Sequence, residues 1–278
     1  MINIVTALTC EANPIIQRYA LRKYPKTAAF PIYENDSMNL IISGMGKFAS
    51  ACAVGYLQSL SQSIAENSMY AGVPHIWLNV GIAGHRTLGL GTVLLAHKIS
   101  DSVEEYTFYP CFTFEAPCAT AEIITVDKAE TQFPEDAAYD MEAVGFCAAA
   151  TRFSSAELIH CLKIVSDNES VSQERITKHV GEELVANQLP VIDALVQEFY
   201  MIQAIANTMF SLPDDYRLLT QKYRFTVTQQ NQLKRLLLRW RTLKSTCLSE
   251  EMAMGDFKNA KQLLMAIESE LQPILFMC

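Results

Sequence analysis

Three acidic side chains stand where an apolar strand or helix pattern meets a loop. Glu11 follows the first apolar run, Glu142 lies at the start of the helix pattern in "DMEAVGFCAAATRF", and Asp167 ends the strand pattern "CLKIVSD". A carboxylic acid that burial keeps protonated can donate a proton to a leaving group, and an ionised carboxylate can activate water. Each residue alone could equally be a helix cap or a solvated loop residue. As a set they indicate a site for general acid and base chemistry.

The elements that must position these residues alternate between strand and helix over about the first 205 residues. Strand patterns occupy residues 3–8, 39–44, 75–81, 92–100, 121–126 and 161–167, and helix patterns occupy 12–24, 48–66 and 140–153. Consecutive β-branched residues in several strands are typical of burial on both faces. The alternation predicts an α/β fold, a three-layer α/β/α sandwich around a mostly parallel mixed sheet. Ligands bind such sheets at the carboxyl ends of the strands, so the acidic residues would meet in one crevice.

Further polar or glycine-rich segments stand at the same strand ends. They contain Gly44 in "SGMGK", Gly81 and Ile82 in "GIAGH", Asp127 after "EIITV", and Ser166 directly before Asp167. "SGMGK" lacks the four residues between glycines that a P-loop requires. It is therefore either a tight turn or a loop whose backbone N–H groups approach a ribose or an anion.

After about residue 205 the alternation stops, and residues 206–278 have the pattern of a helical extension. Helix patterns are expected at 223–245 and 249–276. The first of them carries the basic residues Lys234, Arg235, Arg239, Arg241 and Lys244 among leucines. Such a helix could bind nucleic acid, an acidic membrane surface or a partner, or it could pack its leucine face on a core and leave the basic face in solvent.

Composition limits the function classes. The formal net charge of −8 over 278 residues argues against nucleic acid as the main partner and favours a small molecule or a protein. The eight cysteines form no Cys-x-x-Cys pair and have no histidine at metal-ligand spacing, so we expect free thiols in a reducing cytoplasm and no metal. The N-terminal segment has no signal-peptide pattern, and no apolar run is long enough to predict a transmembrane helix.

The motifs as an ordered set resemble those of a known family. "TALTCEANPII", "LIISGMGKFASACAV", "LNVGIAGH", "YDMEAVGFCAA" and "IVSDNES" follow the order and approximate spacing seen in the purine nucleoside phosphorylase superfamily. The chain is most similar to its methylthioadenosine/S-adenosylhomocysteine nucleosidase branch, over roughly residues 1–205. The resemblance implies a catalytic domain at 1–205, no metal or organic cofactor, a nucleoside substrate, and assembly into dimers or larger homo-oligomers.

The resemblance also implies roles for individual residues. Asp167 would protonate the purine at N7, and Glu11 would position and deprotonate the attacking water. Glu142 would accept hydrogen bonds from the ribose hydroxyls, and Met141 would pack against the sugar. The other matching positions, which would complete the substrate-binding set, are Gly44, Gly81, Ile82, Asp127 and Ser166. An acid and a base on either side of the scissile bond follow the general logic of glycoside hydrolysis.

Two departures from the family bear on the reaction and the base. Asn79 stands where phosphorylases have an arginine that binds phosphate, and Ile82 stands where they have a serine or threonine hydroxyl. Both replacements favour hydrolysis over phosphorolysis. Ala129 and Glu130 occupy the region where the family usually places a phenylalanine against the purine. The aromatic-rich segment 104–115 could supply a stacking ring instead, or it could be a packed flap or an oligomer contact.

We therefore expect a purine nucleosidase that hydrolyses the N-ribosidic bond of an adenosine-type nucleoside, including 5′-modified ones. A phosphate-dependent phosphorylase is the alternative of the same class. A noncatalytic nucleoside-binding or interaction protein that uses the C-terminal helices is the alternative of another class. The intact Glu11, Glu142 and Asp167 argue against the latter, whereas Ile82 and the altered base pocket favour it.

Overall fold

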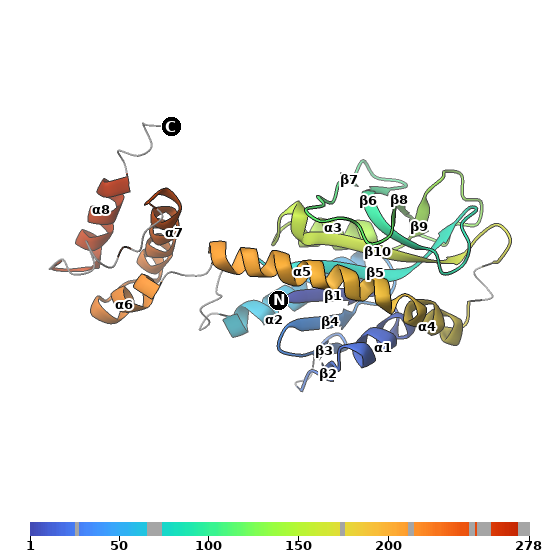
Figure 1. Cartoon of the computed structure of the whole chain (residues 1–278), viewed down its shortest axis with the longest axis horizontal. Helices are drawn as coiled ribbons and strands as arrows, with labels where there is room; N and C mark the ends of the chain where they lie inside the picture. The colour runs from blue at the N-terminus through green and yellow to red at the C-terminus, as the bar shows by residue number, and fades with distance from the viewer. Residues whose placement is uncertain are drawn as a thin grey trace. The chain divides into compact units, whose positions relative to one another are not determined.

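The computed structural model describes residues 1–25, 28–65, 74–172, 176–210, 214–244, 248 and 257–271 (Figure 1). The chain divides into two compact units. Unit 1 comprises Met1–Ser63 and Pro74–Ala204, and unit 2 comprises Ile64–Val73 and Ile205–Cys278. Helix α5 (Leu189–Phe210) runs across the domain boundary expected after residue 205, so a division of the chain into domains at that point stays a prediction.

Unit 1 is built on one ten-stranded mixed sheet. Its strands are β1 (Ile2–Thr6), β2 (Arg22–Lys23), β3 (Ile32–Glu34), β4 (Met38–Ile42), β5 (Ile76–His85), β6 (Val93–Asp101), β7 (Thr107–Phe108), β8 (Ala119–Thr125), β9 (Ala138–Asp140) and β10 (Ile159–Asp167). The six strands expected from the sequence are β1, β4, β5, β6, β8 and β10. The other four have two or three residues each, too few to give a recognisable pattern.

Five of these strands close into a ring. β5 pairs in parallel with β10 and antiparallel with β9, and β10 pairs antiparallel with β6. The ring is completed by parallel pairing of β6 with β8 and of β8 with β9. The register sets Gly84 of β5 opposite both Asp167 of β10 and Tyr139 of β9. It also sets Thr125 of β8 opposite Asp140 of β9, so ring closure brings the ends of four strands to one place.

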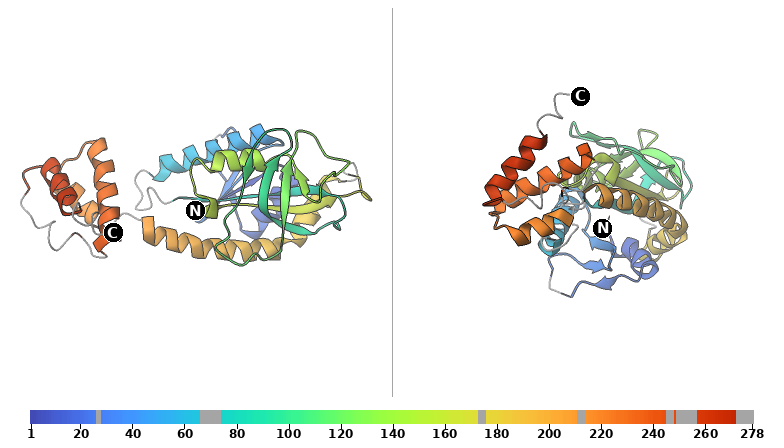
Figure 2. Two further views of the ribbon diagram at one scale, coloured as in Figure 1. Left: turned by 90° about the horizontal axis from the view of Figure 1, so that it is seen from above. Right: turned by 60° about the vertical axis from the view of Figure 1, so that its left-hand side comes forward.

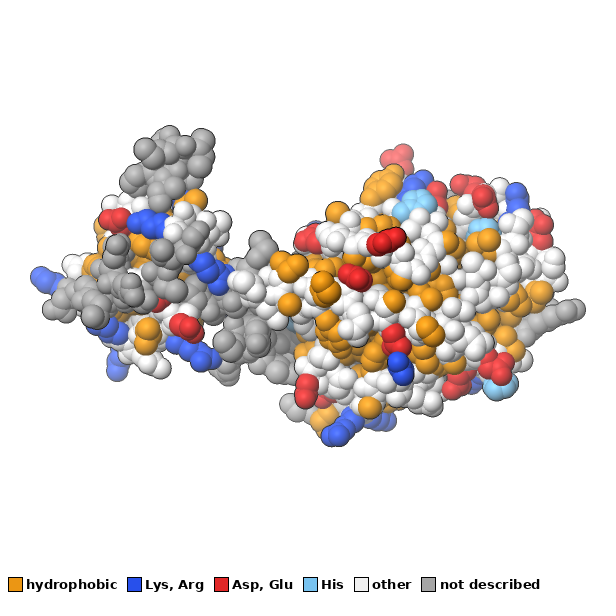
Figure 3. Space-filling model, viewed as in Figure 1, with side chains coloured by type: hydrophobic (Ala, Val, Ile, Leu, Met, Phe, Trp, Pro, Cys, Tyr) orange, Lys and Arg blue, Asp and Glu red, His pale blue; other side chains and the backbone are white. Residues whose placement is uncertain are grey.

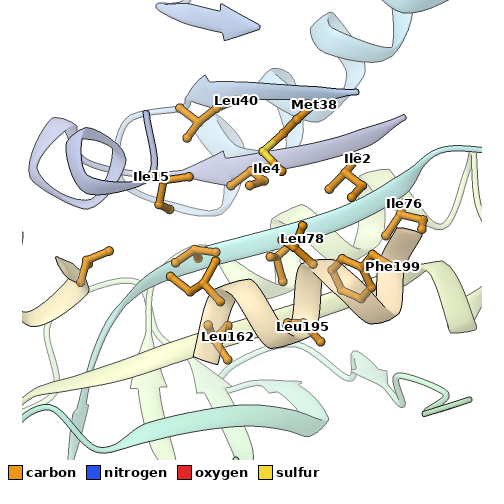
Figure 4. Close-up of a cluster of buried hydrophobic side chains, with 14 of the residues drawn as sticks. Ile2, Ile4, Ile15, Met38, Leu40, Ile76, Leu78, Leu162, Leu195 and Phe199 are labelled. Carbon is orange, nitrogen blue, oxygen red and sulfur yellow. The ribbon is translucent and has the colours of Figure 1, made fainter. Parts of the chain in front are cut away.

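Helices cover both faces of the sheet (Figure 2). α1 (Thr9–Arg18), α4 (Lys178–Asn187) and α5 pack on one face, and α2 (Lys47–Ala65) and α3 (Ala143–Ala150) pack on the other. Figure 4 shows part of the first core, where Ile2 of β1 and Ile76 of β5 cluster with Phe199 of α5. Successive residues of β1 enter different cores, as Ile4 and Val5 do, because strand side chains alternate between faces. The predicted three-layer sandwich is confirmed.

Two helices differ from the expected bounds. α1 begins at Thr9, before the expected residue 12, and Glu11 therefore lies in its first turn. It ends at Arg18 because Ala20 adopts a left-handed conformation with φ 49°. α3 begins only at Ala143, and Asp140, expected in the same helix, ends β9 instead.

Within α5, the segment Leu189–Thr208 is long and apolar enough, by length and composition, to cross a membrane, with a mean hydropathy of 1.3. The sequence did not predict such a segment. Ile192, Leu195 and Phe199 of this helix are fully buried in the core of unit 1. Packing on the sheet accounts for part of its apolar character, because 28% of its apolar window is buried.

Unit 2 contains α6 (Asp214–Lys222), α7 (Val227–Lys244) and α8 (Ala260–Leu271), which share a core of their own. Leu233, Leu236, Leu237 and Trp240 of α7 are buried in that core, so the apolar face of the basic helix is already covered. Figure 3 shows Lys and Arg side chains on the visible face of this unit. Part of the second expected helix, residues 249–256 and 272–276, lies outside the described residues.

Gly145 permits the close packing of α3 against the start of α2, because a side chain there would overlap the backbone of Lys47. We expect Gly145→Ala to lower the free energy of unfolding by about 1–3 kcal/mol, since backbone must move. Gly55→Ala in α2, where a new methyl group meets no atom within 4 Å, is the matched control and should stabilise by about 0.5–1 kcal/mol. Urea unfolding of both variants measures this, and equal effects would contradict the close-packing role.

Candidate active site

A cavity lies at the end of the strand ring. It is lined by Ala7, Leu8, Glu11, Met45, Ile82, Ala83, Gly84, Val126, Ala129, Glu130, Tyr139, Asp140, Met141, Glu142, Ser166 and Asp167. Five of these described residues carry carboxylates, and none of them is a Lys, Arg or His. The cavity volume is about 80 Å³, so a ligand as large as a nucleoside would extend from it towards solvent.

The carboxylate of Glu11 accepts three backbone hydrogen bonds. Oε2 accepts the N–H groups of Ala7 and Leu8 at 2.9 and 2.8 Å, and Oε1 accepts that of Ile82 at 3.0 Å. Leu8 is the N-cap residue of α1, so this contact satisfies an N–H group that the helix leaves unpaired. Burial raises the pKa of the Glu11 carboxyl group, although the backbone bonds and Lys163 favour its ionised form. The carboxylate is thus held in one orientation and can accept a proton from water.

Asp167 ends β10 with one carboxylate oxygen occupied. Ser166 Oγ donates a hydrogen bond to Asp167 Oδ1 at 2.6 Å. A side-chain carbon on Gly84 would lie 2.9 Å from Asp167 Oδ2, so only glycine leaves room for this oxygen. Burial raises the pKa of Asp167, and the bond from Ser166 opposes that rise. Because Oδ1 already accepts a hydrogen bond from Ser166, Oδ2 is the oxygen that would carry the proton.

Glu142 is the N-cap residue of α3, and its carboxylate reaches the loop before α2. The N–H group of Gly46 donates to Glu142 Oε1 at 2.8 Å. Burial raises the pKa of Glu142 to about 7, with Lys163 lowering it and Asp140 raising it. Hydroxyl donors from a ligand would favour the ionised form of this carboxylate.

A buried ion pair supports the carboxylates. Lys163 Nζ lies 2.7 Å from Asp140 Oδ2, and both side chains are shielded from solvent. Asp140 Oδ2 also accepts the N–H group of Ala143 at 2.8 Å, and Oδ1 accepts the hydroxyl of Thr125 at 2.7 Å. Burial disfavours a charged lysine, but the charges of Asp140 and Glu142 hold the pKa of Lys163 above its ordinary value. Lys163 is therefore a cation among acidic groups.

Sequence reasoning overlooked Lys163, although the signal was present. A lysine inside the apolar strand "CLKIVSD" needs a carboxylate partner, because an unpaired buried ammonium group is costly. Glu11 Oε1 and Lys163 Nζ lie 3.2 and 3.3 Å from the position that a side-chain carbon on Gly81 would take. Apart from the ion pair with Asp140, Lys163 Nζ makes no hydrogen bond to the described residues, and it acts on the carboxylates through its charge from behind the cavity lining.

The structure brings most of the sequence-predicted site residues together. The ones that line the cavity are Glu11, Ile82, Met141, Glu142, Ser166 and Asp167. Gly81 does not line the cavity, but it adjoins the side chains of Glu11 and Lys163.

Gly44 and Asp127 do not line the cavity. Gly44 has φ 81° and forms the turn before α2, which agrees with the tight-turn interpretation of "SGMGK". Asp127 lies on the surface and forms an ion pair with Lys47, whose Nζ lies 2.7 Å from Asp127 Oδ1. The same Nζ lies 2.8 Å from Asp101 Oδ2. Their contribution is to fix loops around the cavity.

The aromatic segment 104–115 supplies no ring to the cavity. Tyr106 and Phe108 pack on the core beneath α2 and α3, and Phe112 and Phe114 pack on the opposite core. Four of the five rings in this segment therefore pack on the protein, whereas that of Tyr109 is 63% exposed. Ala129 and Glu130 do line the cavity, so a carboxylate lies where the family resemblance led us to expect an aromatic contact.

Replacing Glu142 should stabilise the protein in a pH-dependent way. Burial disfavours the ionised carboxylate in the folded protein and raises its pKa from 4.5 to about 7. The stability that the protonated Glu142 side chain contributes is therefore fully present below pH 4.5. It is lost as the pH rises through 7. We expect Glu142→Gln to raise the free energy of unfolding by about 3 kcal/mol at pH 8 and by little at pH 4.5.

Chemical unfolding at both pH values measures this difference. Glu135→Gln, on the exposed part of the loop before β9, is the control and should show no such pH dependence. A stabilisation by Glu142→Gln that is equal at both pH values would contradict the raised pKa.

Comparison with known proteins gives matches among solved structures only. No family model matches the chain, and no curated protein sequence matches it. A methylthioadenosine/S-adenosylhomocysteine nucleosidase from Helicobacter pylori is 14% identical with a TM-score of 0.53, over 71% of this chain and 97% of its own. Futalosine hydrolase from Helicobacter pylori gives the same identity, TM-score and coverage. The nucleosidase from Streptococcus pneumoniae is 18% identical with a TM-score of 0.52, over 69% of this chain and 96% of its own.

These solved structures match at nearly their full length, so this chain carries further residues that they lack. They belong to the nucleoside phosphorylase/hydrolase superfamily. At these identities the match establishes the fold, and the chain has the fold of that superfamily, as its motifs led us to expect.

Proposed function

We propose that this protein is a purine nucleosidase that hydrolyses the N-ribosidic bond of adenosine-type nucleosides, including 5′-modified ones. The observation that carries the proposal is a cavity that combines a carboxyl group of raised pKa at Asp167 with an oriented carboxylate at Glu11 and no lining cation among the described residues. The fold shared with nucleosidases and a futalosine hydrolase supports it.

In this mechanism Asp167 acts as the general acid. Its raised pKa keeps a larger share of the carboxyl group protonated, and Oδ2 passes the proton to N7 of the base as the ribosidic bond breaks. The hydrogen bond from Ser166 to Oδ1 then stabilises the carboxylate that remains.

Glu142 binds the ribose in this mechanism. Its Oε1 is fixed by Gly46, and the carboxylate accepts hydrogen bonds from the 2′ and 3′ hydroxyls. Positive charge develops on the sugar as the bond breaks, and a nearby carboxylate stabilises it. Met141 lies beside Glu142 in the cavity lining and packs against the sugar.

Glu11 activates the water in this mechanism. It lines the cavity, and its Oε1, which accepts one backbone N–H group, accepts a second hydrogen bond from the attacking water. Glu11 then takes a proton as the water oxygen attacks the anomeric carbon. Lys163 keeps the surrounding carboxylates from repelling one another.

Hydrolysis fits this cavity better than phosphorolysis does. Five carboxylates line it, and an anionic nucleophile would meet like charges without a guanidinium or ammonium group in the lining. Asn79, at the position of the phosphorylase arginine, is buried and donates to the carbonyl of Val5. Arg18, another possible phosphate ligand, forms a two-point contact with Asp193.

The test is base release by the purified full chain from adenosine, methylthioadenosine, S-adenosylhomocysteine, 5′-deoxyadenosine and inosine, with and without phosphate. We expect release without phosphate, and a roughly 10²–10⁴-fold loss of kcat in Asp167→Asn, which cannot donate the proton. Strict phosphate dependence would indicate the phosphorylase. Binding of these nucleosides without release would indicate a noncatalytic role.

We further propose that residues 1–205 form the catalytic domain, that 206–278 form a helical extension, and that the protein is a cytoplasmic homo-oligomer. The six described cysteines are free thiols, which suits a reducing compartment. Met45 is 64% exposed beside the cavity, and Phe48 is 86% exposed at the start of α2. Such exposed apolar side chains next to a site favour coverage by a second copy.

Light scattering of the eluted protein tests the assembly. We expect a dimer or larger species, and we expect Phe48→Glu to shift it towards the monomer because a charge would be buried at the contact. Val227→Glu in unit 2, at a side chain that is 74% exposed, is the control and should not change the mass. A monomeric wild-type protein would contradict the proposal.

A further inference from the structure

The loop between β8 and β9 is held at three points around the cavity. Asp127 at its start pairs with Lys47. Phe133 is buried in its middle, with ring carbons next to Gly84 in the space that also adjoins Asp167 Oδ2. At its end the N–H group of Glu135 donates to the hydroxyl of Tyr139 at 2.9 Å.

Glu130 projects a carboxylate from this anchored loop into the cavity lining. Its Oε1 accepts the N–H groups of Thr131 and Gln132 at 2.8 and 2.7 Å, so the turn itself fixes the orientation of the carboxylate. Its Oε2 has no hydrogen-bond or ion-pair partner among the residues that the structure describes. The side chain is half-buried, so water can satisfy this oxygen in the free protein, and a nucleoside that displaces the water must offer a donor in its place.

The other carboxylates of the lining are partly occupied. Ser166 donates to Asp167 Oδ1, and Asp140 is bonded by Thr125 and Lys163. The hydroxyl of Tyr139 accepts the N–H group of Glu135 and keeps its own proton, so it can still donate. Glu130 Oε2 is therefore an acceptor that is left to match an N–H donor of the base.

We propose that Glu130 determines base specificity by accepting a hydrogen bond from the exocyclic 6-amino group of the purine. This inference rests on the proposed nucleosidase function and narrows its substrates to 6-aminopurine nucleosides. A site that hydrogen-bonds a substrate N–H group discriminates against analogues that lack it, because the carboxylate is then left desolvated without a partner.

The experiment compares kcat/KM for base release from adenosine, inosine, purine riboside and N6,N6-dimethyladenosine. If methylthioadenosine, S-adenosylhomocysteine or 5′-deoxyadenosine is a better substrate than adenosine, the same set of bases is compared on the sugar of that nucleoside. Purine riboside lacks the 6-substituent, and the dimethylated base lacks the N–H donor. The variants are Glu130→Ala, Glu130→Gln and, as a control in the same loop, Glu135→Ala, whose side chain does not line the cavity.

We expect Glu130→Ala to lower kcat/KM for adenosine about 10- to 100-fold while changing that for purine riboside less than about threefold. Glu130→Gln keeps an acceptor and should recover part of the loss, and Glu135→Ala should behave as wild type. An equal loss for adenosine and purine riboside would reduce Glu130 to a loop-positioning residue. A loss for inosine but not for adenosine would assign the contact to N1–H and overturn the 6-amino assignment.

The experiments distinguish a failure of the proposed hydrolase function from a failure of the Glu130 inference. If wild-type protein releases no base from any nucleoside, the hydrolase proposal fails. The Glu130 inference is then judged by calorimetric titration of adenosine and purine riboside into the same variants. A preference for adenosine that disappears in Glu130→Ala supports it, and equal binding of the two nucleosides overturns it.

Discussion

The buried ion pair between Lys163 and Asp140 is the interaction on which the site depends. The cavity gathers five carboxylates, and the negative charges of Asp140 and Glu11 add to burial in raising the pKa of Glu142. One fully buried ammonium group offsets part of that repulsion, and Asp140 in turn caps the first N–H groups of α3. Removing either partner would leave an uncompensated charge and disturb the position of Glu142, so the pair couples the helix start to the chemistry.

Most of the fold could be predicted because its strands are long and apolar. The six main strands and α2 were recognisable from patterns several residues long, and the polar residues at their ends pointed to the cavity. Glu11, Glu142 and Asp167 could be found because carboxylates beside buried elements are uncommon without a role. The motif resemblance placed them in one site, and strand-end geometry gave an independent reason for expecting the same.

Other features follow from long-range pairing that local sequence does not encode. β9 has three residues, yet it closes the strand ring by pairing on both sides. Its presence moved Asp140 out of the expected helix and made it a partner of Lys163. Asp127 fits the family motif, but it forms an ion pair with Lys47 on the surface and does not line the cavity. The sequence of 104–115 does not indicate which way its aromatic rings point, and packing against two cores places four of them.

Ring closure also limits how molecules of this protein could join edge to edge. A strand with unpaired N–H and C=O groups is a template for another chain, and closing a sheet removes such edges. Here the strands that carry the site are paired around the ring, and the opposite end of the sheet stops at β2, whose two residues are the exposed Arg22 and Lys23. Two adjacent positive charges on a two-residue strand oppose the addition of an identical strand. The same closure that assembles the cavity thus protects the sheet from aggregation.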